Sequence, residues 1–341
     1  MFDWLMVLET LGYILIFPGF LFCFLVGLFL AGVDRKIVAK MQKRVGPPLL
    51  QPFYDFFKLC GKETIVPAAA NKGVFLAAPL LGLASLIVLQ LFIPVFNFTA
   101  FSTMADIIVI LYLLLIPALA MIVGGAASAS PYAGVGLSRE MVTVIACELP
   151  LVLVLLAVAK TVGNAMGTGL VFSMGEISRF QFANGSLITH VSMIPAAIAF
   201  LLIIPGETGS HPFDTAEAET EICEGLLAEY SGAPLAVYKL SHSIKVLTLS
   251  SLFVALFCGG LGGKIAMLVG SFGLAPAAAG MISGLLGAIV LVLLCLVITI
   301  VFISLVHAIT ARLKIEQVFK YYWTVVTGLA LLSLVLAWYG F

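Results

Sequence analysis

Residues 107–127 read IIVILYLLLIPALAMIVGGAA, a run of 21 residues without a charged side chain. An α-helix rises about 1.5 Å per residue, so this run is long enough to cross a hydrocarbon core about 30 Å thick. The whole chain is 62% hydrophobic and 10% charged, whereas about a quarter of the residues in soluble domains are charged. Run and composition together predict an all-α, polytopic membrane protein and exclude an ordinary soluble enzyme.

Eight apolar runs of this kind follow one another, and the whole chain, 1–341, is predicted to form a single membrane domain. The fifth run is short and the seventh is long. The predicted spans are Leu11–Ala31, Val74–Phe96, Ile107–Ala127, Met141–Val162, His190–Pro205, Leu235–Gly259, Met281–His307 and Tyr322–Tyr339. We expect the first of them to be a retained helix and not a cleaved signal peptide.

Basic residues are distributed unevenly between the connections. The first connection, 34–73, contains eight of the seventeen Lys and Arg residues, so the positive-inside rule places it in the cytoplasm. With eight crossings, the later cytoplasmic connections receive five more basic residues and the external ones only three. This asymmetry predicts both termini outside and the acidic connection, 206–234, in the cytoplasm of an inner or plasma membrane protein.

Cysteine spacing gives no sign of a redox centre in this chain. The six cysteines are scattered singly and no CxxC or Cys/His cluster occurs, so neither an iron–sulfur cluster nor a structural zinc site can be built with the usual spacings. No Gly-rich phosphate loop is present either. We therefore assign no metal ligand to this chain, and any redox cofactor must belong to a partner.

The acidic connection, GETGSHPFDTAEAETEICEGLLAEYSG at 206–232, contains seven of the seventeen carboxylates and no Lys or Arg. A helix starting near Asp214 would place Asp214, Glu217, Glu221 and Glu224 on one face. Under protein cover, desolvation and mutual repulsion would raise the pKa of some of these acids, so that protons are shared near neutral pH. A solvated acidic loop that only balances the basic one is the alternative.

Ionisable residues also stand beside or inside predicted spans, where a charge costs on the order of 3 kcal/mol to insert. Glu207 follows the fifth run, and Glu140 and Glu148 flank and enter the fourth. Arg139 is the neighbouring base that could pair with Glu140, whereas Glu148 has no basic neighbour within two turns. Lys245 in the sixth run either belongs to the same site or extends to the interface, and both readings stay open.

Four segments carry a family resemblance, in the same order along the chain. The acidic connection resembles the cytoplasmic loop after the fifth helix of the respiratory complex I membrane subunit called subunit 1 or H. KRVGPPLLQPFYDFFKLCGKE, SREMVTVIACELP and ARLKIEQVFKYYW resemble that family's first loop, its third-loop and fourth-helix region, and its seventh-to-eighth connection. The matches extend from Arg44 to Trp323, nearly the whole chain.

Two departures from the family pattern indicate a branch. Quinone-reducing members tend to have RxGPNxxGxxGLLQP where this chain has the shorter RVGPPLLQP, 44–52, which resembles the membrane-bound group 4 [NiFe] hydrogenases of the energy-converting and formate hydrogenlyase type. The family's Arg before PFD is replaced around Ser210 and His211, which removes the nearest base for Glu207. Both departures favour a ferredoxin-linked hydrogenase over a quinone-reactive enzyme such as an NADH:quinone oxidoreductase, which is the alternative.

The resemblance implies a coupling protein that holds no cofactor itself. Iron–sulfur clusters and a NiFe centre are expected in hydrophilic subunits docked on the cytoplasmic face, with antiporter-like membrane subunits alongside and no nucleic acid. Carboxylates would pass protons or charge toward the subunits that move protons or sodium ions. The implied relay residues are Glu140, Glu148, Glu207, Asp214, Glu217, Glu219, Glu221, Glu224, Glu229 and Lys245. The implied docking residues are Arg44, Gln51, Asp55, Lys58, Lys62, Arg139, Pro212, Phe213, Tyr230 and Arg312.

The first connection is predicted to contain a short amphipathic helix at the membrane surface, because prolines break any longer one and PFYDFFKLCGKE then places its aromatic residues largely on one face. It would anchor the chain in lipid, form the floor beneath the docked subunit, or both. Two readings from other classes are a stand-alone proton-coupled transporter and a structural anchor. A transporter should show an internal repeat, and the sequence shows none.

Overall fold

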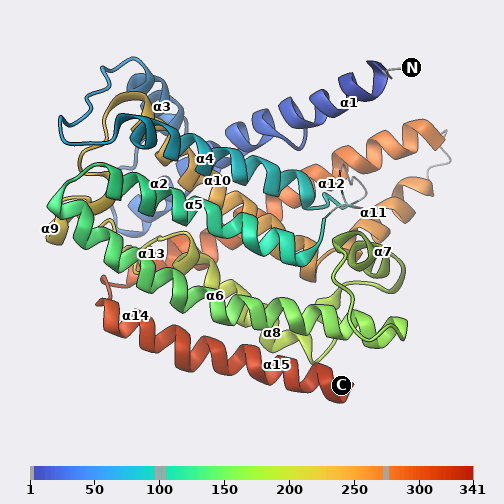
Figure 1. Cartoon of the computed structure of the whole chain (residues 1–341). Helices are drawn as coiled ribbons and strands as arrows, with labels where there is room; N and C mark the ends of the chain where they lie inside the picture. The colour runs from blue at the N-terminus through green and yellow to red at the C-terminus, as the bar shows by residue number, and fades with distance from the viewer. Residues whose placement is uncertain (1–3, 97–100, 102–104, 272–275, 341) are drawn as a thin grey trace.

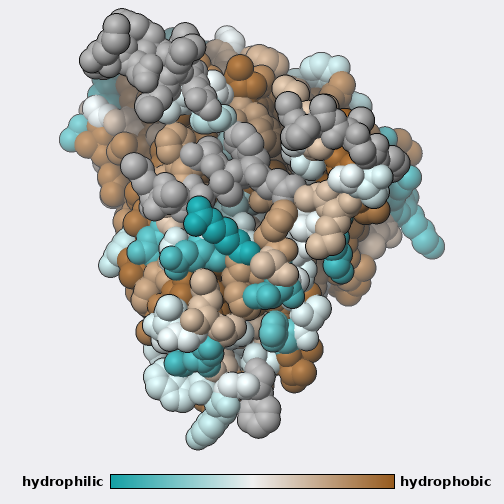
Figure 2. All heavy atoms as spheres, turned by 90° about the vertical axis from the view of Figure 1, so that its right-hand side faces the viewer, coloured by the Kyte–Doolittle hydropathy of each residue, from teal (hydrophilic) through white to brown (hydrophobic). Residues whose placement is uncertain are grey.

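The computed structural model describes residues 4–96, 101, 105–271 and 276–340. In these ranges every regular element is a helix, apart from one isolated β-bridge between Asp106 and Ser173. The long helices lie side by side along one direction (Figure 1). We call the end that carries α3, α9 and residues 208–231 the loop end, and the end that carries α7 and α11 the far end. The far end mixes hydrophilic and hydrophobic residues (Figure 2).

The described residues form fifteen α-helical segments. Their bounds are α1 Trp4–Leu15, α2 Phe20–Met41, α3 Gln51–Cys60, α4 Lys72–Phe92, α5 Ile107–Ala127, α6 Pro131–Met166, α7 Met174–Asn184, α8 Met193–Glu207, α9 Glu219–Ile222, α10 Gly232–Phe257, α11 Gly260–Gly270, α12 Pro276–Ile298, α13 Leu305–Ile309, α14 Ile315–Tyr321 and α15 Thr327–Tyr339. Two π-helical segments, η3 Thr299–Ser304 and η4 Tyr322–Val326, interrupt the last two long helices.

Seven segments of the described chain are long and apolar enough to span a membrane, one fewer than the eight predicted. They are Thr10–Met41, Lys72–Phe92, Ile107–Ala127, Pro131–Met166, Gly232–Phe257, Ala278–Ile309 and Ile315–Tyr339. The predicted fifth span is α8, whose 15 residues extend only about 22 Å. Most of α8 is buried, in contact with α6, α10 and α15, so its length does not have to match the lipid.

Helix α10 forms the centre of the bundle, because it packs on α2, α3, α4, α8 and α12 and almost all of its side chains are buried. Several of its hydroxyls find partners inside the bundle: Thr248 donates to the Ile244 carbonyl at 2.8 Å, and Ser251 donates to Gln90 Oε1 at 3.0 Å, whereas the buried hydroxyl of Ser250 has no hydrogen-bond partner among the described residues. Small hydroxyl residues let helices approach closely in the absence of a hydrophobic driving force. The centre of the bundle can therefore hold polar groups.

The amphipathic helix predicted in the first connection is α3. Its aromatic side chains Phe53, Phe56 and Phe57 meet the ring of Phe24 from α2 edge to face, with centroids 5.2–6.3 Å apart. Lys58 on the same helix is exposed. The helix therefore packs one face on the bundle and exposes Lys58, which confirms the predicted amphipathic helix, whereas its position at the membrane surface stays a prediction.

The acidic stretch does not form the predicted helix. Residues 209–218 are irregular, and α9 contains only four residues, because Cys223 and Glu224 adopt left-handed backbone conformations with φ of 51° and 65°. Asp214 and Glu221 turn instead to arginines from distant parts of the chain. An ion pair with an arginine stabilises each acid, whereas a shared helical face would bring like charges together.

Candidate functional site

A buried ion pair lies near the loop end of the bundle. Lys245 Nζ of α10 lies 3.0 Å from Glu207 Oε1 at the end of α8, and the two side chains are 10% and 5% exposed. Lys245 therefore does not extend to the membrane interface. Glu207 thus has a base although the family's Arg is missing nearby in the sequence, because the base comes from the next long helix, α10.

Glu140 of α6 faces the same place from a third helix. It lines a small cavity, which we call the carboxylate cavity, together with Glu207, Glu217 and Lys245. The predicted pair of Glu140 with Arg139 does not form, because adjacent residues of a helix point to different sides. With Asp214, which also lines it, four carboxylates and one ammonium group thus surround a cavity of about 40 Å³, which has room for roughly three waters.

Glu217 reaches this cavity from the irregular part of the acidic stretch and is half-buried. Burial raises its pKa to about 7, with further contributions from the negative charges of Glu140, Asp214 and Glu224, while Lys239 acts in the opposite sense. A carboxyl group with this pKa exchanges its proton near neutral pH. The expectation that one acid of this stretch titrates there holds, although the helical face invoked for it does not.

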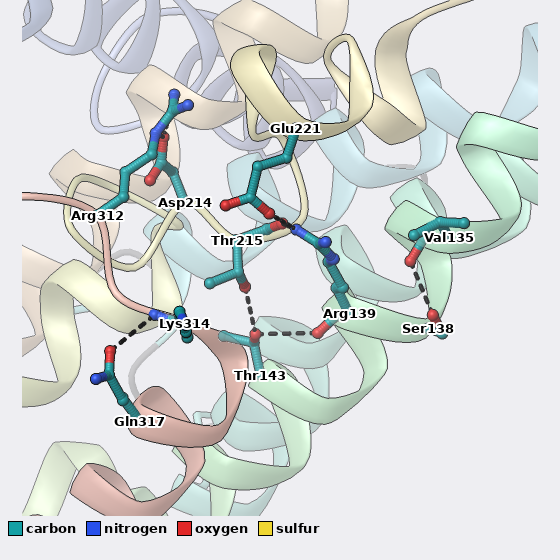
Figure 3. Close-up of polar contacts among 10 residues, drawn as sticks. All are labelled: Val135, Ser138, Arg139, Thr143, Asp214, Thr215, Glu221, Arg312, Lys314 and Gln317. Atoms are coloured by element: carbon teal, nitrogen blue, oxygen red, sulfur yellow. Dashed lines mark hydrogen bonds and ion pairs between the residues drawn. The ribbon is translucent and has the colours of Figure 1, made fainter.

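The acidic stretch is held to α6 by a first set of polar contacts (Figure 3). Arg139 donates to Glu221 Oε2 at 2.6 Å and to the carbonyl of Thr215 at 3.3 Å. Thr215 Oγ1 lies 3.3 Å from Thr143 Oγ1 of α6. Because Glu221 is 55% exposed, this pair lies at the rim and contributes little stability.

A second set of contacts holds the stretch to the connection before α14. Arg312 lies 2.8 Å from Asp214 Oδ2 (Figure 3). His211 Nδ1 lies 3.2 Å from Asp214 Oδ1. The ring of His211 stacks on that of His307, with centroids 4.5 Å apart. Asp214 is therefore an anchoring residue between two segments distant in sequence as well as a neighbour of the carboxylate cavity.

The other predicted relay acids lie further from this cavity. Glu148 is half-buried on α6, and Glu229 is exposed. Glu224 is half-buried and lines a larger cavity, and the side chain of Glu219 lies outside the described residues. The structure therefore brings Glu140, Glu207, Glu217 and Lys245 together, with Asp214 beside them, but not the remaining members of the predicted relay.

The larger cavity, of about 280 Å³, lies between α2, α3 and α10. We call it the central cavity. Asp55 of α3 lines it and lies 2.8 Å from Arg35 Nη1 and 2.9 Å from Gln51 Nε2. Burial opposes ionisation of Asp55, but the hydrogen bonds from Gln51 and Arg35 outweigh it and lower the pKa below its usual range. The side chains of Asp55 and Gln51 are thus hydrogen-bonded to each other, and Asp55 also pairs with Arg35 of this chain.

The predicted docking residues divide by exposure. Arg44, Lys58 and Lys62 are exposed, and Arg44 donates to Gln42 Oε1. The buried ones pack on this chain's own residues: Phe213 lies against the rings of Tyr321 and Tyr322, Tyr230 stacks on Phe75 with centroids 4.0 Å apart, and Pro212 is buried beside Phe213. Only the exposed residues offer a surface to another protein in this conformation.

Two residues that line these cavities are not among the predicted site residues. His242, one turn before Lys245, lines both the carboxylate cavity and the central cavity. Asp34, at the end of the first apolar run, accepts a hydrogen bond from Ser304 at 2.6 Å. Its position directly before Arg35 and Lys36 made it look like part of a solvated charged loop. Among the described residues, no three His, Cys, Asp or Glu side chains gather as a metal site.

Comparison with known proteins places these features in a family. The family model described as NADH dehydrogenase matches residues 14–338. Hydrogenase-4 component C of Escherichia coli (strain K12) is 34% identical over 250 residues, which cover 72% of this chain and 76% of that protein. The H subunit of the NADH-quinone oxidoreductase from Hyphomonas neptunium is 32% identical over 325 residues, 90% and 88% of the two chains. A chain of an archaeal respiratory membrane complex, the membrane-bound sulfane sulfur reductase, superposes with a TM-score of 0.81 at 28% identity, covering 93% of this chain and 96% of that one.

Proposed function

The chain belongs to the NADH dehydrogenase family and is a multi-pass membrane protein, and from this premise we propose that it couples electron transfer in docked subunits to ion movement in neighbouring membrane subunits. The observation that carries the proposal is the carboxylate cavity, in which the Lys245–Glu207 pair, Glu140 and Glu217 meet. A proton on Glu217 is exchangeable near neutral pH.

The proposed mechanism is electrostatic. A change of charge in a docked subunit at the loop end alters the proton affinity of Glu217, and the change is passed to Glu140 and to the Lys245–Glu207 pair. Charges interact strongly in this setting because the effective dielectric constant of a protein is far below that of water. This chain itself performs no redox chemistry in the proposal.

We place the complex in the branch of membrane-bound [NiFe] hydrogenases. Support comes from the shortened RVGPPLLQP segment, from Ser210 where the family has Arg, and from the similarity to a hydrogenase-4 component. The partners would carry iron–sulfur clusters and a NiFe centre, with antiporter-like subunits alongside. Purification of the complex from its native membrane in mild detergent tests the branch, because hydrogenase and NADH-oxidising subunits are readily told apart by mass spectrometry.

The coupling role is tested on the whole complex in proteoliposomes. Glu207→Gln and Glu140→Gln are each expected to keep electron transfer in the docked subunits but to lower the number of ions moved per electron pair. Glu176→Gln, an exposed acid on α7 at the far end, is the matched control. If both site variants translocate ions like the control, the carboxylates of this chain do not couple the two processes.

The central cavity favours one second candidate, a quinone site. Its volume of about 280 Å³ is near the lower end for ligand pockets, and apolar side chains such as Leu28 and Phe56 line it together with polar ones. A photoreactive quinone analogue would label α2, α3 or α10 of the intact complex if quinone binds there. Labelling that excess quinone suppresses would favour this candidate over the hydrogenase branch.

A further inference from the structure

Asp34 lines three cavities, namely the central cavity described above and two further ones. The carboxylate comes from α2 near the loop end and accepts a hydrogen bond of 2.6 Å from Ser304, which is fully buried. Ser304 belongs to the π-helical segment η3, and its hydroxyl also lies 3.3 Å from the carbonyl of Thr299 in the same segment. π-helical turns are frequent at functional sites, and here one presents a hydroxyl to a carboxylate.

On one side Asp34 faces solvent. A cavity of about 340 Å³, the outer cavity, is lined by Asp34, Arg35, Arg44, Val45 and His307 among others. Val45 is fully exposed, so this cavity opens at the surface of the loop end. Water therefore has access to the carboxylate of Asp34 from the same end of the bundle to which we assign the docked subunits.

On the other side Asp34 faces the interior. A cavity of about 50 Å³, the bridging cavity, lies between Asp34 and His242, and polar side chains of Ser210, Ser243 and Thr299 also line it. This volume has room for roughly three waters. Apolar side chains such as Leu30, Val246 and Ile303 also line the cavity, so hydrogen bonds to such waters must come from the polar groups at its two ends and from these three hydroxyls. His242 also lines the carboxylate cavity, where Glu207 and Lys245 lie.

We infer that Asp34 takes up protons for this chain, connecting solvent in the outer cavity through the bridging cavity and His242 to the Lys245–Glu207 pair. The inference rests on the proposed coupling function and adds a route to it. The Asp34 carboxylate accepts a proton from solvent and becomes a carboxylic acid. The acid passes the proton to the neutral imidazole of His242, which becomes an imidazolium and releases its other ring proton to a carboxylate of the carboxylate cavity.

The charged groups around Asp34 suit this role. Arg35 of the same helix, His307 of α13 and His211 of the acidic stretch interact electrostatically with Asp34, and His242 of α10 faces it across the bridging cavity. All four are cationic or can become so. Stacking of His211 on His307 places two of these rings together at one side of the carboxylate.

The test uses the whole complex in proteoliposomes and two variants that act at different points. Asp34→Asn removes the proton acceptor, whereas Thr299→Val keeps the size of the side chain and removes a hydroxyl from the bridging cavity. Loss of one positioned acid–base group commonly slows proton transfer at least about a hundredfold, so we expect ion translocation per electron pair to fall at least tenfold in Asp34→Asn. Thr299→Val should lower it less, and Asp34→Glu should restore it.

Infrared difference spectroscopy supplies a second readout, because a carboxyl band that titrates and disappears in Asp34→Asn identifies the proton on this residue. Glu176→Gln is the control for both measurements. If Asp34→Asn and Thr299→Val behave like the control while Glu207→Gln abolishes translocation, the route through Asp34 is wrong and the coupling function stands. If Glu207→Gln also behaves like the control, the coupling function itself fails.

Discussion

Replacing Lys245 by Met removes the only basic partner that the structure gives Glu207 among the described ion pairs. At 3.0 Å and an effective dielectric constant of about 20, the attraction between two unit charges is about 5 kcal/mol. Removal of one member of a buried pair leaves an uncompensated charge and typically costs about 3–5 kcal/mol. We expect the free energy of unfolding to fall by that amount, because both side chains are at most 10% exposed.

The assay is thermal unfolding of the detergent-purified complex, followed through a probe on this chain. A loss of about 3–5 kcal/mol corresponds to a fall in melting temperature of roughly 4–7 °C for a chain of this size. Lys264→Met, an exposed lysine on α11, is the matched control and is expected to change stability by less than about 0.5 kcal/mol.

A double-mutant cycle separates the pair from other effects. Glu207→Gln alone leaves Lys245 unpaired, and the double variant leaves neither charge, so the double variant should be more stable than the sum of the two single losses predicts. The coupling energy should be at least about 2 kcal/mol. If the two single losses simply add, Lys245 and Glu207 do not stabilise each other. The same conclusion follows if Lys245→Met is as stable as Lys264→Met.

Three further predictions concern the acidic stretch and its surroundings. The pKa of Glu217 in the folded protein, about 7, lies above its ordinary value of 4.5, so the free energy of unfolding should fall by up to about 3 kcal/mol as pH rises from below 4.5 to above 7. Glu217→Gln should flatten pH-dependent stability in that window, and an unchanged slope would assign the titration to another group. Glu221→Gln should lower stability by less than about 1 kcal/mol, because its pair with Arg139 is exposed, and a loss above about 2 kcal/mol in thermal unfolding would contradict the rim position. Gly206→Ala should cost about 1–3 kcal/mol, because the added Cβ would overlap the hydroxyl of the buried Tyr322, and wild-type stability would show that the helices separate easily there.

The membrane class, the positions of the spans and the surface helix α3 follow from the sequence because each depends on local properties. The run at 107–127 coincides with α5, and PFYDFFKLC lies within α3. Length, charge content and spacing of apolar residues decide such elements without reference to the rest of the chain. Only α8 departs from this rule, since its burial by other helices relaxes the need for length.

The site could be predicted in its composition but not in its pairings. Glu140, Glu207, Glu217 and Lys245 are recognisable as costly residues, yet their partners are separated by tens of residues in sequence. Asp214 pairs with Arg312, and the backbone around it is irregular instead of forming the helix that the spacing of the acids predicted. Spacing arguments describe neighbours within one helix, whereas charges in a membrane protein find their partners across helices.

The shortness of α8 has a consequence for biogenesis. At about 22 Å it is a weak signal for insertion on its own, and the helix that covers it includes the end of the described chain: Tyr322 donates to the carbonyl of Leu202 at 3.1 Å, and Ser333 of α15 donates to that of Ser192 at 2.7 Å. The chain must therefore be translated through α15 before α8 reaches its final environment. Until α15 has been made, the segment with Glu207 is only partly covered by the rest of the chain, so the nascent protein depends most on chaperones and is most open to proteolysis in that period.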